Sequence, residues 1–239
     1  KKWGEKELNS VDCRFEFKME AIADKAFFIA KKNYALHILN DEGFDVTDEK
    51  KRWKYKGIKL VSASMPKKVK PLVEKVLQKI ILTKSKDEAN KLYIDSFDTF
   101  KTLHIDDIAL IKSLNKLNEY VERSNRWSAA KGMQAHYRGA YYYNKLIDEL
   151  GISANYEKIK QSDKVKFVYL NPNNKYGLNV ISYIDKYPKE FEDLFEVDTE
   201  LMFDKCIKDT VDQFYTALGW KLNKPNYQPV LSIEKSFFS

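Results

Sequence analysis

Residues 15–43 read FEFKMEAIADKAFFIAKKNYALHILNDEG, and this stretch decides how the fold begins. Two apolar runs, Phe27–Ile29 and Ala35–Leu39, flank the polar sequence KKNY at 31–34. Short runs rich in β-branched and aromatic residues are typical of strands. The pattern therefore predicts cations on a rigid surface, where lysines can meet phosphates and a tyrosine can contact a sugar. A solvated lysine pair at a strand end would give the same pattern.

Composition limits the classes of protein that are possible. The chain has 239 residues, of which 44% are hydrophobic and 14% aromatic, and this argues against disorder. Such a length can form one large or two small domains. The 42 Lys and Arg residues outnumber the 35 Asp and Glu residues and give a net charge of +7. This excess favours a polyanionic partner.

Cysteines and termini give further expectations. Cys13 and Cys206 are too few and too far apart for a disulfide framework or a zinc site. The sequence has no apolar run long enough to span a membrane and no basic-then-apolar leader. Because it begins at Lys1 in mid-pattern, we expect a fragment, a processed product or a trimmed chain.

Strand and helix patterns follow one another along the chain. Arg14–Met19 alternates like an edge strand, and Phe44–Lys59 is interpreted as a connector with Trp53 and Tyr55 packed inward. Pro66 is expected to open the first long helix, whose apolar stripe runs from Val69 to Ile81.

A proline and a serine-containing loop bear on where this first helix starts and on what could bind there. Pro71 means that the helix either starts nearer Lys70 or kinks there. Hydroxyls of the preceding loop, with a lysine beside them, could hold a phosphate; these residues are Ser62, Ser64 and Lys67. A plain helix cap is the alternative.

A second helix is expected over Asp87–Leu103. Within it, residues 93–98 (YIDSFD) look superficially like a metal-binding turn, but such a turn needs carboxylates at a tight hairpin between apolar strands. Asp106 and Asp107 are interpreted as the N-cap and first turn of a helix over Ile108–Leu117. The sequence therefore predicts no metal-binding carboxylate pair.

The segment at 131–147, KGMQAHYRGAYYYNKLI, predicts another helix. His136 and Arg138 could donate to phosphates near its start, and Gly139 would let the backbone approach something closely. The alternative is an Arg held by a local carboxylate and a partly packed His.

The final third of the chain alternates strands, a turn and a helix. Lys164–Leu170 reads as a strand with Lys164 and Lys166 on one face, returning as Leu178–Tyr183 after a turn. A last helix is expected from Asp198 to Gly219, followed by an extended tail.

Several of these stretches together resemble one family. Residues 19–36, MEAIADKAFFIAKKNYAL, resemble the end of the palm in family B DNA polymerases, in particular the T-even-type bacteriophage replicative enzymes, whose Lys-Lys-x-Tyr motif lies against the duplex. The Lys56-Gly57 turn, the serine loop with Pro66, residues 136–144 (HYRGAYYYN) and the lysine strand at 164–170 resemble that family in the same order.

The resemblance implies an α+β fold in which a small antiparallel palm-remnant sheet precedes a largely helical thumb with a small β insertion. The expected boundaries are 1–60 for the palm end and connector, 61–222 for the thumb and 223–239 for an extended tail. The chain would grip primer–template duplex and support processive replication. The catalytic aspartates and the two Mg²⁺ ions would lie in the missing exonuclease, palm and fingers part, so this chain alone holds no cofactor and should bind but not polymerise.

The resemblance also implies the site residues and partners. Besides the N-terminal part and the duplex, the expected partner is a sliding clamp, met by Ile233, Phe237 and Phe238 of the tail. These two phenylalanines could instead fold back on the chain's own core. The expected compartment is the cytoplasm of a phage-infected bacterium, with no membrane contact. The DNA-contacting residues would be Lys31, Lys32, Tyr34, Ser62, Ser64, Lys67, His136, Arg138, Gly139, Lys164 and Lys166.

Two other classes of function remain open. The chain could be a non-catalytic nucleic-acid-binding or clamp-tethering module, or an α+β interaction protein whose basic surface serves solubility. The strand-like start favours the polymerase reading, because an independent module has little reason to begin with an unfinished sheet.

Overall fold

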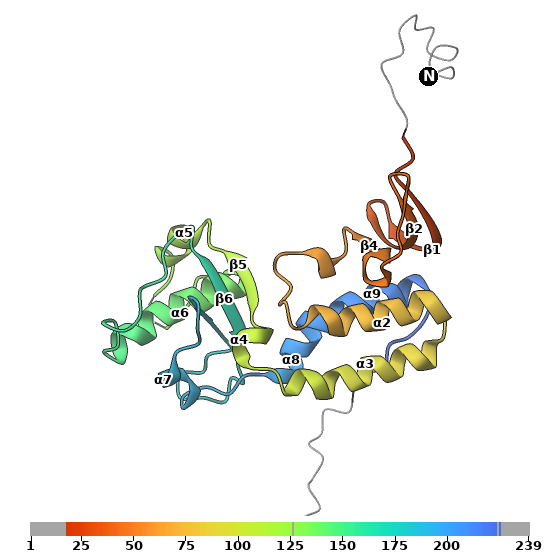
Figure 1. Cartoon of the computed structure of the whole chain (residues 1–239). Coiled ribbons are helices and arrows are strands. Elements are labelled where there is room, and N and C mark those ends of the chain that lie inside the picture. The colour runs from red at the N-terminus through yellow and green to blue at the C-terminus, as the bar shows by residue number, and fades with distance from the viewer. Residues whose placement is uncertain (1–17, 126, 224, 226–239) are drawn as a thin grey trace, which may run out of the picture. The chain divides into compact units, whose positions relative to one another are not determined.

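The computed structural model describes residues 18–125, 127–223 and 225 (Figure 1). The chain divides into two compact units, Lys1–Val61 (unit 1) and Ser62–Ser239 (unit 2). Unit 1 is a small sheet and unit 2 combines helices with a second sheet, all strand pairs being antiparallel. The predicted α+β class is therefore confirmed.

The sheet of unit 1 is built around one central strand. That strand, β2, pairs with each of the other three strands. The two apolar runs of the sequence fall inside the first two strands, so the strand prediction is confirmed there. The bounds are β1 Ala21–Ala30, β2 Asn33–Asp41, β3 Phe44–Asp45 and β4 Trp53–Lys56.

The connector predicted over Phe44–Lys59 is wrong in part, because it contains two strands and a 3-10 turn, η1 (Glu49–Arg52). Trp53 and Tyr55 are half-buried and stack with ring centroids 6.2 Å apart. Aromatic residues alternating with lysines suit a pleated surface. A second 3-10 turn, η2, follows at Lys59–Val61. Of the predicted strand Arg14–Met19, the last two residues precede β1 and the rest lies outside the described residues.

A buried histidine ties three elements of unit 1 together. His37 on β2 places Nδ1 2.6 Å from Oδ1 of Asp24 on β1 and Nε2 3.0 Å from Oε1 of Glu49 on η1. The hydrogen bond with His37 lowers the pKa of the Asp24 carboxyl. The Trp53 ring packs against the imidazole at a centroid distance of 4.9 Å and is tilted by 53° from it.

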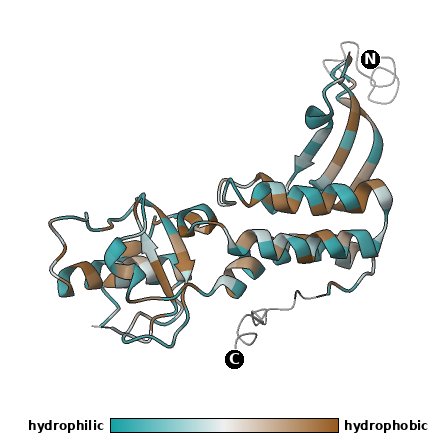
Figure 2. Cartoon of the chain, turned by 60° about the horizontal axis from the view of Figure 1, so that its bottom comes forward, coloured by the Kyte–Doolittle hydropathy of each residue, from teal (hydrophilic) through white to brown (hydrophobic). Residues whose placement is uncertain are grey.

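The helices of unit 2 pack through an aromatic cluster. Phe203 is fully buried, and its ring centroid lies 5.0–5.5 Å from those of Tyr93, Phe97 and Phe100. Figure 2 shows polar and apolar residues alternating around α2 and α3, in keeping with helices that bury one side. The bounds are α2 Lys70–Thr83, α3 Lys86–Lys101, α8 Thr199–Phe203, the π-helical turn η3 Asp204–Lys208 and α9 Asp209–Ala217.

The helix predictions for this part are largely confirmed. Pro71 lies in the first turn of α2, so the helix starts at Lys70 and does not kink. Pro66 is not the first residue of the helix; it begins a turn that leads into α2, in which the amides of Val69 and Lys70 donate to the Pro66 carbonyl over 3.1 and 3.2 Å. The segment YIDSFD lies within α3, as expected.

The last helix begins and ends where predicted but is interrupted. Asp198 caps α8 by accepting a hydrogen bond from the Leu201 amide over 2.9 Å, and Gly219 follows α9 with a φ of +68°. Between α8 and α9 the helix changes to the π-helical turn η3, which the spacing of apolar residues does not predict.

The second sheet has the order β5-β6-β7, and its first strand was not predicted. The helix expected over Ile108–Leu117 is wrong: the short helix α4 ends at Ile108, and β5 pairs with β6 through Leu110 opposite Phe167. The N-cap of α4 is His104, not Asp106, which donates its amide to the His104 ring. The bounds are α4 Ile105–Ile108, β5 Leu110–Ser113, α5 Leu117–Val121, α6 Ala135–Glu149, β6 Lys164–Tyr169, β7 Val180–Tyr183 and α7 Lys189–Glu192.

Helix α6 lies directly on β7, and Gly139 makes this contact possible. A Cβ at Gly139 would stand 2.5 Å from Ser182 Oγ and 2.6 Å from the Ser182 nitrogen. The Ser182 hydroxyl donates to the His136 carbonyl over 2.8 Å. The close approach predicted for Gly139 therefore exists, and the neighbour is a strand of the same unit.

Replacing Gly139 by Ala should destabilise the protein. In a helix interior without a clash, this change stabilises by about 1 kcal/mol through helix propensity. Here the added methyl group must push β7 away, which costs about 1–3 kcal/mol as overpacking. Guanidinium denaturation should therefore show a lower free energy of unfolding. A variant more stable than the parent protein would contradict the close packing of α6 on β7.

Candidate nucleic-acid interface

The two lysines of the opening motif form the turn between β1 and β2. Ala30 pairs with Asn33, so Lys31 and Lys32 are the two residues outside the ladder. Both side chains are exposed, and Lys32 adopts a left-handed backbone with a φ of 66°. The hairpin fixes the backbone that carries these two exposed cations, and their contact with DNA stays a prediction.

A glycine after β4 supports this turn from the side. Gly57 has a φ of +69°, and a Cβ there would stand 2.1 Å from the Lys32 carbonyl oxygen and 2.2 Å from Asn33 Oδ1. Only a residue without a side chain allows the backbone after Lys56 to lie this close to the turn.

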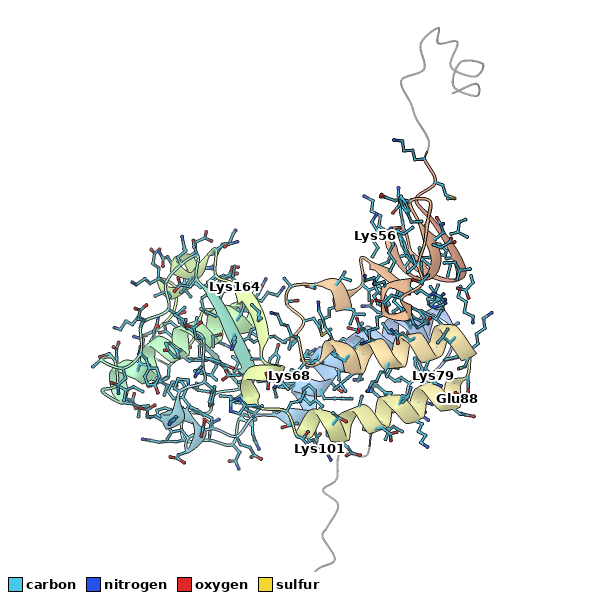
Figure 3. All side chains as sticks on the ribbon, in the orientation of Figure 1. Lys56, Lys68, Lys79, Glu88, Lys101 and Lys164 are labelled. Atoms are coloured by element: carbon cyan, nitrogen blue, oxygen red, sulfur yellow. The ribbon has the colours of Figure 1, made fainter. Side chains whose placement is uncertain are left out.

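An aromatic row crosses the sheet beside the turn. Phe28 on β1 pairs with Tyr34 on β2, which pairs with Lys56 on β4. The Phe28 and Tyr34 ring centroids are 5.6 Å apart, and Lys56 Nζ lies 5.9 Å from the Tyr34 centroid. Figure 3 labels Lys56 among the side chains of this sheet. Three lysines and a half-buried tyrosine thus occupy one end of the sheet, an arrangement that can bind phosphates and a sugar.

Phe28 is the residue of this row that the sequence reasoning missed. Its side chain is 68% exposed, which is unusual for phenylalanine. The signal was present, because adjacent residues in a strand point to opposite faces. Phe27 and Phe28 could not both turn inward.

In unit 2, the serine loop lies before α2. Ser62 and Ser64 are half-buried, and their hydroxyl oxygens are 2.8 Å apart. Lys67 is exposed, the first turn of α2 has no acidic residue, and no side chain caps the helix. The first amides of α2 are already engaged, since Lys70 donates to the Pro66 carbonyl, Leu72 and Val73 donate to the Val69 carbonyl, and Pro71 has no N–H. The groups left for an anion here are the two hydroxyls and the Lys67 ammonium.

The two predicted lysines of β6 differ in their surroundings. Lys164 is exposed at the first position of the strand, opposite Ser113 of β5, and is labelled in Figure 3. Lys166 is half-buried; its ammonium donates to the Asp185 carbonyl and lies 3.6 Å from Asp106 Oδ1. Lys164 is therefore the better placed of the two to meet a phosphate.

The HYRG segment is mainly a packing element in this structure. His136 is 9% exposed, and burial, followed by the charge of Lys112, lowers the pKa of its imidazole. Gly139 is buried against β7. Arg138 is half-buried, and its Nη1 donates to the Met133 carbonyl over 3.4 Å. Arg138 is thus the residue of this segment that retains exposed surface for an anion.

Neither the predicted clamp-binding tail nor any metal-binding group or membrane-spanning helix adds a residue to the candidate interface in the part of the chain that the structure describes. Ile233, Phe237 and Phe238 of the expected clamp-binding tail lie outside the described residues. Within residues 18–125, 127–223 and 225, no three His, Cys, Asp or Glu residues are grouped so that they could hold a metal ion. No helix of that part is long and apolar enough to cross a membrane.

Comparison with known proteins gives little guidance. No protein-family model matches the chain. A curated protein of Methanocaldococcus jannaschii, named "Putative glycyl-radical enzyme activating enzyme", is 33% identical over 84 residues. The match covers 34% of this chain and 33% of that protein, so the chain spans about a third of that relative's length.

Replacing Gly57 by Ala should disturb the lysine turn more than an equivalent change elsewhere in the sheet. The new methyl group would collide with the Lys32 carbonyl, so we expect faster hydrogen exchange of the β2–β4 amides and weaker duplex binding. The matched control is Gly43→Ala, because Gly43 also has a positive φ, +96°, but nothing lies within 4 Å of its Cβ position. Equal effects of the two changes would mean that backbone strain alone, and no contact with the turn, explains the result.

Proposed function

We propose that this chain is the C-terminal part of a family B DNA polymerase, comprising the end of the palm and the thumb, and that it holds primer–template duplex through phosphate contacts. The observation that carries this proposal is the Lys31–Lys32 turn. Two exposed cations stand on a rigid hairpin end with Tyr34 and Lys56 beside them. The lysine pair and tyrosine that resemble the polymerase motif therefore share one end of one sheet.

Rigidity is the physical reason that this arrangement suits duplex binding. A lysine on a fixed backbone loses less freedom on binding than one on a disordered tail. Each cation that neutralises a phosphate releases counterions, so its contribution depends on salt and not on base sequence. A polymerase must move along any sequence, and such contacts are independent of sequence.

Unit 2 offers a second set of groups of the same kind. The Ser62–Ser64 loop carries two hydroxyls and is followed by the exposed Lys67, and Lys164 stands exposed on β6. Phosphate binding by lysines and hydroxyls is common in nucleic-acid-binding proteins. These groups support a thumb that contacts the duplex backbone.

In the proposed enzyme, the catalytic residues lie in the N-terminal part and not in this chain. The carboxylates that bind two metal ions would belong to the N-terminal part, which would also supply the fingers and the exonuclease. The chain should therefore bind duplex and leave a primer unextended when supplied with nucleotides and Mg²⁺.

The direct test is fluorescence anisotropy of a labelled primer–template duplex across a salt series, with single-stranded DNA of equal length as the control. We expect tighter binding to the duplex, and a logarithm of affinity that falls linearly with the logarithm of salt concentration. No binding at low salt would refute the proposal, since the basic surface would then be only solvated.

Changing Lys31 and Lys32 together to Ala should weaken duplex binding and reduce the salt slope by about one to two, because each lost phosphate contact removes about 0.9 from the slope. The matched control is Lys50→Ala with Lys51→Ala, an adjacent exposed pair in η1 that changes the net charge by the same amount. An unchanged slope in the first variant, or equal changes in both, would remove the turn from the interface.

A further inference from the structure

The far end of the unit 1 sheet carries an exposed phenylalanine in an acidic setting. Phe44 is 78% exposed, and it follows the turn between β2 and β3. Residues 41–48 read DEGFDVTD, with four carboxylates and no cation, in a chain whose net charge is +7. This end is thus opposite in charge to the lysine turn.

The turn presents Phe44 on a fixed backbone. Glu42 and Gly43 both have left-handed backbones, with φ values of 50° and 96°. The Gly43 amide donates to Asn40 Oδ1 over 2.9 Å, and Asn40 Nδ2 donates to Asp45 Oδ1 over 3.0 Å. The turn therefore fixes the backbone that exposes the Phe44 ring to solvent. Because this backbone is already ordered, binding a partner would cost little conformational entropy on this side of the interface.

The charge at this end is only partly compensated. Lys54 lies 3.2 Å from Glu20 and 3.3 Å from Asp41, and the hydrogen bonds to these carboxylates, that to Glu20 first, raise the pKa of its ammonium. Glu42 and Asp48 are exposed. A phosphate or an acidic surface would be repelled here, whereas Arg or Lys side chains would be attracted.

A shallow hollow accompanies the exposed ring. It measures about 440 Å³ and is lined by Asp41, Glu42, Phe44, Asp45, Val46, Thr47, Asp48 and Lys51. Its walls combine one aromatic ring with four carboxylates and one lysine, Lys51, so negative charge is in excess. Such a lining suits a segment that has an apolar side chain between basic ones, because Arg can stack on the ring while it pairs with a carboxylate.

We propose that this acidic tip, Asp41–Asp48, is a docking site for a basic peptide segment of a partner protein, whose apolar side chain packs on Phe44 and whose Arg or Lys residues pair with the surrounding carboxylates. The proposal is independent of the DNA-binding function. From Tyr34 to Asp41, β2 extends about 23 Å, more than twice the screening length of about 8–10 Å in physiological salt. The two ends of the sheet can therefore bind opposite charges without interference.

The experiment uses the whole chain and short fluorescein-labelled peptides made of Arg-Leu-Gly repeats, with Arg-Ser-Gly and Glu-Leu-Gly repeats as controls. We expect anisotropy to show the Arg-Leu-Gly peptide bound most tightly, with affinity falling as salt rises. The Phe44→Ala change should weaken this binding by at least about tenfold, as expected for loss of a buried phenylalanine contact. Glu42→Gln with Asp45→Asn should flatten the salt dependence while keeping the shape of the turn.

The matched control is Phe28→Ala, which removes a ring of similar exposure, 68% against 78%, from the lysine end and should leave peptide binding unchanged. Circular dichroism and the thermal unfolding midpoint of the Phe44→Ala variant should match those of the parent protein, which shows that the variant is folded whether or not the chain binds DNA. Absence of peptide binding, equal binding of the Arg-Leu-Gly and Arg-Ser-Gly peptides, or an unaltered affinity after Phe44→Ala would overturn the proposal. None of these outcomes would alter the test of duplex binding.

Discussion

The pairing of β2 with three other strands is the constraint on which unit 1 depends. β2 brings the Lys31–Lys32 turn, the Tyr34 ring and Lys56 to one end, and the tip around Phe44 to the other. An isolated two-stranded hairpin is marginally stable in water, so the short strands β3 and β4 matter for the position of both ends. The buried His37, held between Asp24 and Glu49, links η1 to this ladder.

The distribution of exposed apolar side chains separates the two units. Of the nine large hydrophobic side chains that are exposed among the described residues, six belong to unit 1, and they are Met19, Ile22, Phe28, Leu39, Phe44 and Val61. Unit 2 buries its aromatic residues in clusters such as that around Phe203. A small sheet with this much exposed apolar surface is typical of a part that meets other polypeptides, which agrees with the proposal that this chain completes a larger enzyme.

Much of the fold could be predicted where local pattern and final packing agree. The runs Phe27–Ile29 and Ala35–Leu39 form strands, and the stripe from Val69 forms α2, because their periodicity matches the face they bury. β5 could not be found in this way. Ile108, Ile111, Leu114 and Leu117 recur at a spacing that a helix would also show, and the strand exists only because β6, distant in sequence, pairs with it.

For the candidate site, the structure tests only where the predicted residues lie and how exposed they are. Lys31, Lys32 and Tyr34 share one sheet end, since strand geometry fixes them locally.

His136 and Gly139 were expected near phosphates, yet they are buried because α6 lies on β7, a contact that the local sequence does not encode. At Gly139 the prediction of a close approach was right, although the neighbour is the strand β7 rather than the expected phosphate. The sequence signals that some backbone must come close, but only the fold decides whether that neighbour is a ligand or a strand. A phosphate role is therefore argued best for residues whose position is local, such as the Lys31–Lys32 turn, and packing is the stronger reading for residues that lie on a long-range contact.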